Sequence, residues 1–142
     1  MKHRLVIIKL GGSVITFKEK PLSANYKAIN NISKILSKLE IPLIIVHGGG
    51  SYGHYWSVKF DMHTKLHKYH PHGISVVHSS MLTLNNIIIN ALDKHRLNPY
   101  GISPSSFLIN GQPNSNKIIE LKKMTKHNIT PVTYGDAVYI KN

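Results

Sequence analysis

The sequence predicts an α/β fold, with a mainly parallel sheet and helices on both of its faces. Two observations carry this prediction. Short runs of branched apolar residues alternate with longer segments of helical periodicity, which is typical of a parallel sheet. Two of those apolar runs also end directly in glycine-rich segments, KLGGS at 9–13 and HGGGSYGH at 47–54. At 142 residues the chain is long enough for one domain with its own core.

The first half of the chain predicts two strands, each followed by a helix. We expect a strand over 5–10, a loop over 14–24, a helix over 25–39 capped by Ser23 or Asn25, and a strand over 42–46. A short helix should open near Ser51 and carry His54 in its first turn. The apolar face expected for the helix over 25–39 consists of Ile29, Ile32, Ile35, Leu36 and Leu39.

The second half begins with a polar, His-rich segment over 60–73, which we interpret as a loop or lid. A long helix follows over 74–94, then a strand over 100–103 and a tight hairpin at Asn110-Gly111. A weaker helix over 118–127 precedes two strands, over 129–134 and 137–140. The buried stripe expected for the long helix consists of Val77, Met81, Leu84, Ile88 and Leu92.

Each glycine-rich segment has the chemistry of a phosphate cradle. Backbone N–H groups without Cβ bulk, placed between a strand and a helix N-terminus, bind anionic oxygens. Two such cradles in one domain indicate two phosphorylated ligands that meet, as phosphoryl transfer requires.

Charge and composition limit the classes of partner. The formal net charge is +12, from 18 Lys and Arg against 6 acidic residues, and a basic surface suits small anionic substrates. Neither an aromatic-interleaved basic groove nor a recognition-helix pattern accompanies this charge, which argues against a nucleic-acid partner. The absence of cysteine excludes disulfides, thiolate nucleophiles and cysteine zinc sites. Apolar runs too short for a membrane span and an N-terminus without a signal-peptide layout favour a cytoplasmic protein with no membrane partner.

Four histidines in the 60–73 segment raise the alternative of a metal site. Their lysine neighbours Lys65 and Lys68 oppose a cation, and no carboxylate converges on them, so we favour a solvated lid and predict no metal ligands in this chain. The four are His63, His67, His70 and His72.

Five segments together resemble the amino acid kinase superfamily, whose fold is a three-layer sandwich, and within it the isopentenyl phosphate kinases of archaeal type. They are KLGGSVITFK at 9–18, HGGGSYGH at 47–54, NNIII at 85–89, SPSSF at 103–107 and PVTYGDAV at 131–138. The final His54, with Lys18 nine residues after Lys9, makes the match specific. Acetylglutamate kinases share the HGGG run but not that His, whereas fosfomycin-type kinases resemble the chain closely.

The resemblance implies transfer of the ATP γ-phosphoryl group, with Mg²⁺, to isopentenyl phosphate in a mevalonate-type route of isoprenoid biosynthesis. Two anions must then meet, so cationic donors should matter more than a general base. The resemblance assigns catalysis to Lys9, Lys18 and His54. It assigns ATP binding to Lys9, Gly11, Gly12, Ser13 and Gly49, and acceptor binding to Gly48, Gly53, His54, Ile74, Val77 and Asp136.

Plainer interpretations remain open for part of this set. Asp136 could instead form an Asx turn between two strands. Ile74 and Val77, with Met81, could simply pack in the core rather than wall an isoprenoid tail.

Members of the resembled family are about twice as long as this chain. Their second half supplies most of the nucleotide site, so residues 1–142 resemble a single N-terminal, substrate-binding domain. We expect weak or no kinase activity alone, and sheet edge and apolar surface exposed where that half packs. A gene fragment, a truncated product and one half of a split enzyme are the alternatives. A homodimer or a separate C-terminal half are the partners considered. The other functions left open are a sibling kinase of the fosfomycin or acetylglutamate type and a non-catalytic phosphate- or nucleic-acid-binding remnant.

Overall fold

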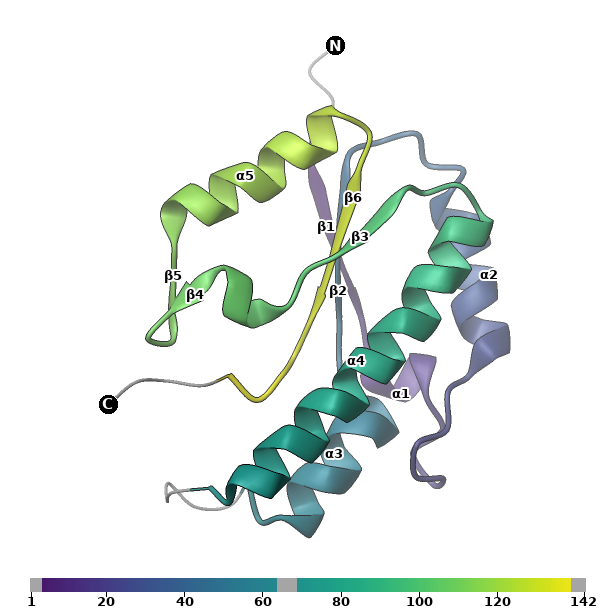
Figure 1. The fold of residues 1–142 in the computed structure, drawn as a ribbon. Helices are drawn as coiled ribbons and strands as arrows, with labels where there is room; N and C mark the ends of the chain where they lie inside the picture. The colour runs from purple at the N-terminus through teal and green to yellow at the C-terminus, as the bar shows by residue number, and fades with distance from the viewer. Residues whose placement is uncertain (1–3, 64–68, 139–142) are drawn as a thin grey trace.

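The structure is a computed structural model that describes residues 4–63 and 69–138 (Figure 1). Its centre is a four-stranded sheet in the order β1-β2-β6-β3, in which every pair of neighbours is parallel. The predicted parallel α/β sheet is therefore confirmed. The strands are β1 (Val6–Leu10), β2 (Leu43–His47), β6 (Thr130–Tyr134) and β3 (Pro99–Gly101).

The strand register brings the glycine-rich loops to one edge of the sheet. Leu10 is opposite His47, and His47 is opposite Tyr134, so β1, β2 and β6 end side by side. The two glycine-rich segments and Gly135-Asp136 follow these ends directly. In open parallel sheets this carboxyl edge is where ligands bind.

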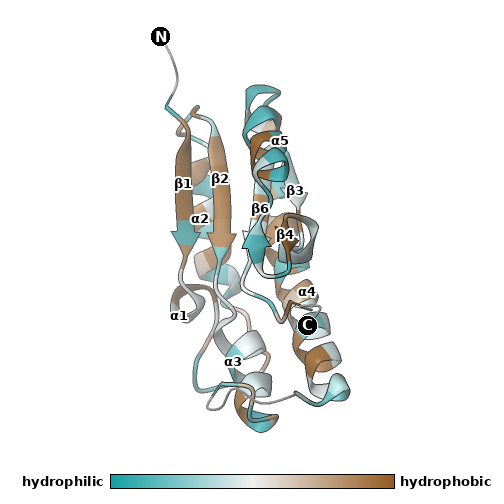
Figure 2. Cartoon of the chain, turned by 90° about the vertical axis from the view of Figure 1, so that its left-hand side faces the viewer, coloured by the Kyte–Doolittle hydropathy of each residue, from teal (hydrophilic) through white to brown (hydrophobic). Residues whose placement is uncertain are grey.

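Helices cover both faces of the sheet. Helices α2 (Tyr26–Leu36) and α4 (Pro71–Lys94) lie on one face and α5 (Ser115–Lys126) lies on the other, as Figures 1 and 2 show from two directions. Helix α3 (Gly50–Lys59) follows β2 and packs beside α4 beyond the carboxyl edge, close to the short helix α1 (Gly12–Ile15).

The buried stripe predicted for the long helix is confirmed and forms the centre of the core. Its five residues are between 0% and 6% exposed: Val77, Met81, Leu84, Ile88 and Leu92. Burying a side chain of this size stabilises a fold by about 1.5–3 kcal/mol. The packing of this stripe therefore fixes α4, and the cavity that α4 lines, against the sheet.

Asparagine side chains begin two of the helices. The Asn25 side chain accepts a hydrogen bond from the Ala28 N–H at 3.1 Å, so Asn25 and not Ser23 caps α2. Asn114 caps α5 in the same way, accepting from the Lys117 N–H at 3.2 Å. That helix consequently begins three residues before its predicted start.

Other predicted segments also differ from the structure. The predicted loop over 14–24 begins inside the helical turn α1. The predicted loop over 60–73 overlaps α4, which starts at Pro71, where a proline suits the first helical turn, and residues 64–68 lie outside the described part of the chain. The strand predicted over 137–140 is not formed at 137–138, and 139–140 lie outside the described residues.

The apolar face predicted for α2 is only partly correct. Ile29 and Leu36 are buried, but Ile35 is 61% and Leu39 41% exposed. Ser33 takes the core position between the two buried residues, and its hydroxyl donates to the Ile29 carbonyl at 2.8 Å. The helix also ends at Leu36, before Leu39.

The predicted Asn-Gly hairpin is present as strands β4 (Leu108–Ile109) and β5 (Gln112–Pro113). Asn110 and Gly111 both have positive φ, 48° and 75°, as a two-residue hairpin turn requires.

The outer face of β1 is the apolar part of the sheet that the described helices leave uncovered. Ile7 on this strand is 66% exposed, and Figure 2 shows the hydrophobic β1 and β2 on this face. Within residues 4–63 and 69–138, no helix is long and apolar enough to cross a membrane.

Candidate functional site

The two glycine-rich loops touch through their backbones. A Cβ on Gly12 would lie 2.4 Å from the Gly50 nitrogen, and a Cβ on Gly48 would lie 3.0 Å from the Gly12 nitrogen. Contacts this short leave no room for a side chain. The sequence put these loops at the ends of adjacent strands, and the structure packs them directly against each other.

Thr16 joins the two loops by hydrogen bonds. Its buried hydroxyl donates to the Gly12 carbonyl at 2.7 Å and accepts from the Ser51 N–H at 2.9 Å. The Ser51 hydroxyl accepts in turn from the Ser23 N–H at 3.1 Å. The segment that carries Lys18 is thereby held against the start of α3.

Not every glycine N–H is available to a ligand. The Gly48 N–H donates to the Leu10 carbonyl at 2.9 Å, and the Gly53 N–H donates to the Gly49 carbonyl at 3.0 Å. These two residues were expected to donate to the acceptor phosphate, and both N–H groups are already engaged. Among described residues, no backbone carbonyl accepts from the N–H of Gly11 or Gly49, so these two can still bind an anion.

A cavity of about 530 Å³, here called the α4 cavity, brings together most of the expected acceptor residues. His54 and Asp136 lie in its wall with apolar groups of α4. The expected residues that line it are Gly49, Gly53, His54, Ile74, Val77 and Asp136, and Met81 lines it with them. Val77 and Met81 also belong to the hydrophobic core, as the core-packing interpretation expected.

A second cavity of about 740 Å³, here called the Lys18 cavity, lies on the other side of the α3 N-terminus. Lys18, His54 and Lys59 contribute to its lining, and no carboxylate does so among the described lining residues. His54 and Gly50 line both cavities. His54, in the second turn of α3 rather than the predicted first, therefore stands between two spaces large enough for small ligands.

Lys9 and Ser13 are not brought into either cavity. Lys9 is exposed on β1, one residue before the first loop, and shares the outer sheet face with Ile7. Ser13 is exposed on α1. The structure thus joins Lys18 and His54 in one cavity, while Lys9 lies beside the carboxyl edge without lining that cavity.

Asp136 has a partner that the sequence did not indicate. Its side chain is 2% exposed, and its Oδ2 lies 2.5 Å from Nδ1 of His78 on α4. Its Oδ1 accepts from the Ala137 N–H at 2.8 Å. The simple turn interpretation of Asp136 is therefore incomplete, because this carboxylate joins the end of β6 to α4.

His47, the first residue of the HGGG run, is buried at the end of β2. Its Nε2 lies 3.1 Å from Oδ1 of Asn85 on α4, and its ring stacks on Tyr134. Burial lowers the pKa of His47 below its ordinary value, although hydrogen bonds to Gly48 and Asn85 oppose this. A buried neutral imidazole serves here as a structural link and not as a cation for phosphate.

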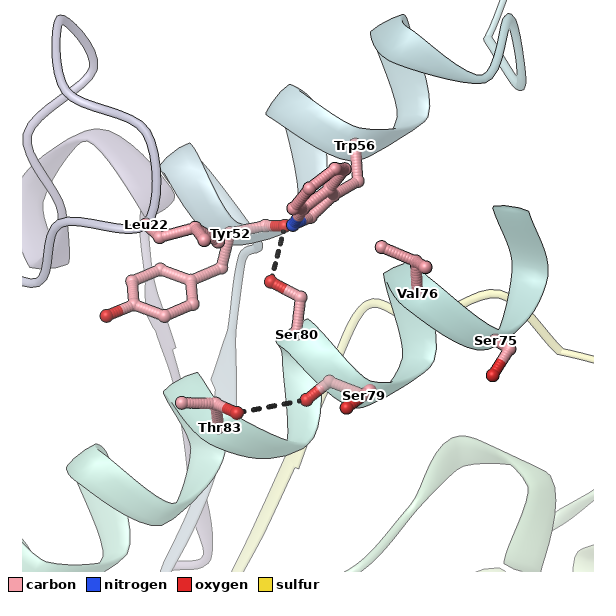
Figure 3. A pocket seen from close by; sticks show the side chains of 8 residues that line it. All are labelled: Leu22, Tyr52, Trp56, Ser75, Val76, Ser79, Ser80 and Thr83. Atoms are coloured by element: carbon pink, nitrogen blue, oxygen red, sulfur yellow. Dashed lines mark hydrogen bonds between the residues drawn. The ribbon is translucent and has the colours of Figure 1, made fainter. Parts of the chain in front are cut away.

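A third cavity of about 490 Å³ lies between α3 and the opposite side of α4 (Figure 3). Hydroxyl and aromatic groups line it, and none of the expected site residues do. In it the Ser80 hydroxyl donates to the Tyr52 carbonyl at 2.9 Å, which fixes α3 against α4 next to Gly53.

The histidines of the predicted lid do not form a metal site in the part of the chain that the structure describes, where no three potential ligands gather. His63 lies beside His54, with ring centroids 6.2 Å apart, and His70 accepts from the His72 N–H. His67 lies outside the described residues.

Comparison with known proteins decides the family. The model of the amino acid kinase family matches residues 4–141. The chain belongs to the amino acid kinase family.

The relatives within this family are named for one activity. The chain is 34% identical to an isopentenyl phosphate kinase of Thermoplasma acidophilum over 97% of its own length and 55% of that protein. It is 32% identical to the isopentenyl phosphate kinase of Methanocaldococcus jannaschii, over 94% of this chain and 56% of that protein. The chain therefore spans about half the length of the curated relatives it matches.

Solved structures agree with the family assignment. A product complex of the T. acidophilum isopentenyl phosphate kinase superposes with a TM-score of 0.83 at 34% identity, covering 97% of this chain and 57% of that one. A UMP kinase from Ureaplasma parvum shares the fold alone. It superposes with a TM-score of 0.62 at 17% identity, covering 94% of this chain and 56% of that one.

Sequence reasoning missed three polar residues of this amino acid kinase domain: Thr16, His78 and Asn85. Each has a partner 35 or more residues away. One signal was available, because His78 and Asn85 are polar residues seven positions apart, two turns along one face of a helix that is otherwise apolar there.

Proposed function

We propose that this domain is the acceptor-binding half of a kinase that transfers the γ-phosphoryl group of ATP to isopentenyl phosphate. The family membership and the names of the relatives support a phosphotransferase of this type. Because the chain spans about half of those relatives, we infer that the nucleotide is held mainly by a polypeptide segment outside these 142 residues. The uncovered outer face of β1 is a surface that such a segment could cover.

One observation carries the proposal: His54 lies in the wall of two adjacent cavities that meet at the glycine contact. An acceptor phosphate in one cavity and a donor phosphate at the mouth of the other would then be neighbours. Phosphoryl transfer depends mainly on such positioning and on neutralisation of charge.

The available side chains suit this chemistry. Lys18 supplies positive charge and His54 a ring N–H donor where two anions would meet. The N–H groups of Gly11 and Gly49 can bind phosphate oxygens. Ile74 and Val77 provide an apolar wall, and each buried methylene of a hydrocarbon tail contributes about 0.8 kcal/mol.

The described residues do not fit a magnesium site. No three potential ligands gather in residues 4–63 and 69–138, and both oxygens of Asp136 already have partners within the chain. We therefore assign no step of the reaction to a metal held by this domain.

Isopentenyl phosphate binding and phosphoryl transfer test the proposal separately. In the first test, isopentenyl phosphate should shift the amide NMR signals of Gly49 and His54, whereas isopentenol should do so far more weakly. In the second, the chain is mixed with the second half of the T. acidophilum relative and Mg-ATP, and isopentenyl diphosphate is measured. Fosfomycin and acetylglutamate serve as competing acceptors. Tighter binding of either of these than of isopentenyl phosphate would refute the acceptor that we propose.

A further inference from the structure

Asp136 creates an electrostatic problem for the proposed acceptor site. Among the described residues that line the α4 cavity, it is the one carboxylate. A bare carboxylate would repel a phosphate that binds in the same cavity, and the repulsion is strong where little water separates the charges. A cavity for an anion should therefore either lack this group or neutralise it.

His78 is placed to neutralise it. Its Nδ1 lies 2.5 Å from Oδ2 of Asp136, within hydrogen-bond distance, and an imidazolium in this position would form a charge-assisted hydrogen bond with the carboxylate. The carboxylate is almost fully buried, whereas the His78 side chain is 41% exposed. The second carboxylate oxygen faces the Ala137 N–H. Each oxygen of the Asp136 carboxylate therefore has a hydrogen-bond partner within the chain.

The position of His78 on α4 supports the same role. It lies one turn after Ile74 and next to Val77, so the helix that forms the apolar wall also carries the partner of Asp136. The charge of Asp136 acts beyond this pair: burial mainly raises the pKa of Tyr134, and Asp136 raises it further, although a hydrogen bond with Ser103 opposes both. The carboxylate is therefore close enough to neighbouring groups for its charge to matter.

We propose that His78 is a positioning residue that makes the α4 cavity compatible with an anionic ligand, by holding the Asp136 carboxylate against α4 and offsetting its charge. This inference rests on the proposed function in that it takes the ligand of the α4 cavity to be a phosphate. It differs from a purely mechanical role, in which His78 only fixes the segment after β6.

A double-mutant cycle separates the two roles. The variants are His78→Leu, Asp136→Asn and the double variant, with His127→Leu on the exposed end of α5 as a control outside the cavity. Binding of inorganic phosphate and of isopentenyl phosphate is measured by titrating the amide signals of Gly49 and His54.

His78→Leu leaves the carboxylate unpaired, so we expect phosphate binding to weaken on the order of tenfold. Asp136→Asn removes the charge and should tighten binding about threefold, and the double variant should bind at least as tightly as the unmodified chain. His78→Gln keeps a hydrogen-bond donor but carries no positive charge, so phosphate binding should weaken about threefold. This variant keeps the test possible if His78→Leu does not fold.

Three results would overturn the inference. Two of them are unchanged affinity in both His78 variants and a double variant as weak as His78→Leu. A wild-type chain that binds no phosphate of either kind would also overturn it. Binding of inorganic phosphate without isopentenyl phosphate would refute only the proposed acceptor, because the cycle can be completed with inorganic phosphate.

Discussion

Contact between the two glycine loops can be tested by adding a single methyl group. Gly50→Ala is the most severe case. Its φ of +47° is unfavourable for a residue with a side chain, and the new Cβ would lie 2.1 Å from Oγ1 of Thr16 and 2.6 Å from the Gly12 carbonyl oxygen. Gly12→Ala has no φ penalty, but its Cβ would lie 2.4 Å from a backbone nitrogen, which cannot move aside as a side chain can.

The expected losses of stability follow from these contacts. A left-handed backbone costs an alanine about 1–2 kcal/mol. Overpacking costs typically about 1–3 kcal/mol. Alanine also lowers the conformational entropy of the unfolded chain, which stabilises the fold by about 0.4–1 kcal/mol and offsets part of these costs. We therefore expect Gly50→Ala to lose roughly 1–4.6 kcal/mol and Gly12→Ala roughly 0–2.6 kcal/mol, from a total of about 5–15 kcal/mol for a domain.

Urea unfolding followed by the fluorescence of Trp56, the one tryptophan of the chain, measures these losses. Gly135→Ala is the matched control, because nothing lies within 4 Å of its new Cβ, and its free energy of unfolding should equal that of the unmodified chain or exceed it by up to about 1 kcal/mol. If Gly50→Ala unfolded at the same urea concentration as Gly135→Ala, the two loops would not be in contact. The site built on that contact would then be refuted.

Three further predictions concern single side chains. Thr16→Val keeps the shape of the side chain but leaves the Ser51 N–H without its acceptor, so the free energy of unfolding should fall by about 1–3 kcal/mol. In the same urea titrations, Thr16→Ser should restore most of that free energy. Because burial lowers the pKa of His47, the unfolded chain takes up a proton at a higher pH than the folded chain does. Stability should therefore fall by up to about 1.4 kcal/mol per pH unit as the pH drops from the ordinary value of 6.5 to the folded-state pKa and stay level below it, and His47→Gln should lack this slope. Lys18→Met should weaken binding of inorganic phosphate on the order of tenfold with stability unchanged, whereas Lys34→Met on α2 should change neither quantity in the same titration.

The features that the sequence predicted well depend on local or periodic signals. The stripe of α4 was found because its apolar residues recur every three or four positions. The turn at Asn110-Gly111 was found because its residue types tolerate positive φ. The glycine-rich loops were assigned to strand ends, and parallel pairing then brings such ends to one edge of the sheet.

The features that it missed depend on partners far away in the chain. Ser33 occupies a core position of α2 where the helical periodicity predicted an isoleucine, because its hydroxyl can donate a hydrogen bond to the Ile29 carbonyl one turn earlier. Thr16 could be recognised as a link between the loops only after both loops were placed. His78 and Asp136 are 58 residues apart, and nothing local to either one indicates the other.

Helix α4 combines two tasks that would otherwise conflict. Its polar residues hold neighbouring parts of the site: Asn85 contacts the end of β2, His78 contacts the segment after β6, and Ser80 bonds to α3. Its apolar residues Ile74 and Val77 face the cavity between those parts. Because different side chains hold the site and form its wall, the size of the α4 cavity can change while the glycine-rich loops keep their places. Ile74→Ala should therefore enlarge the α4 cavity and favour longer tails without weakening the binding of inorganic phosphate.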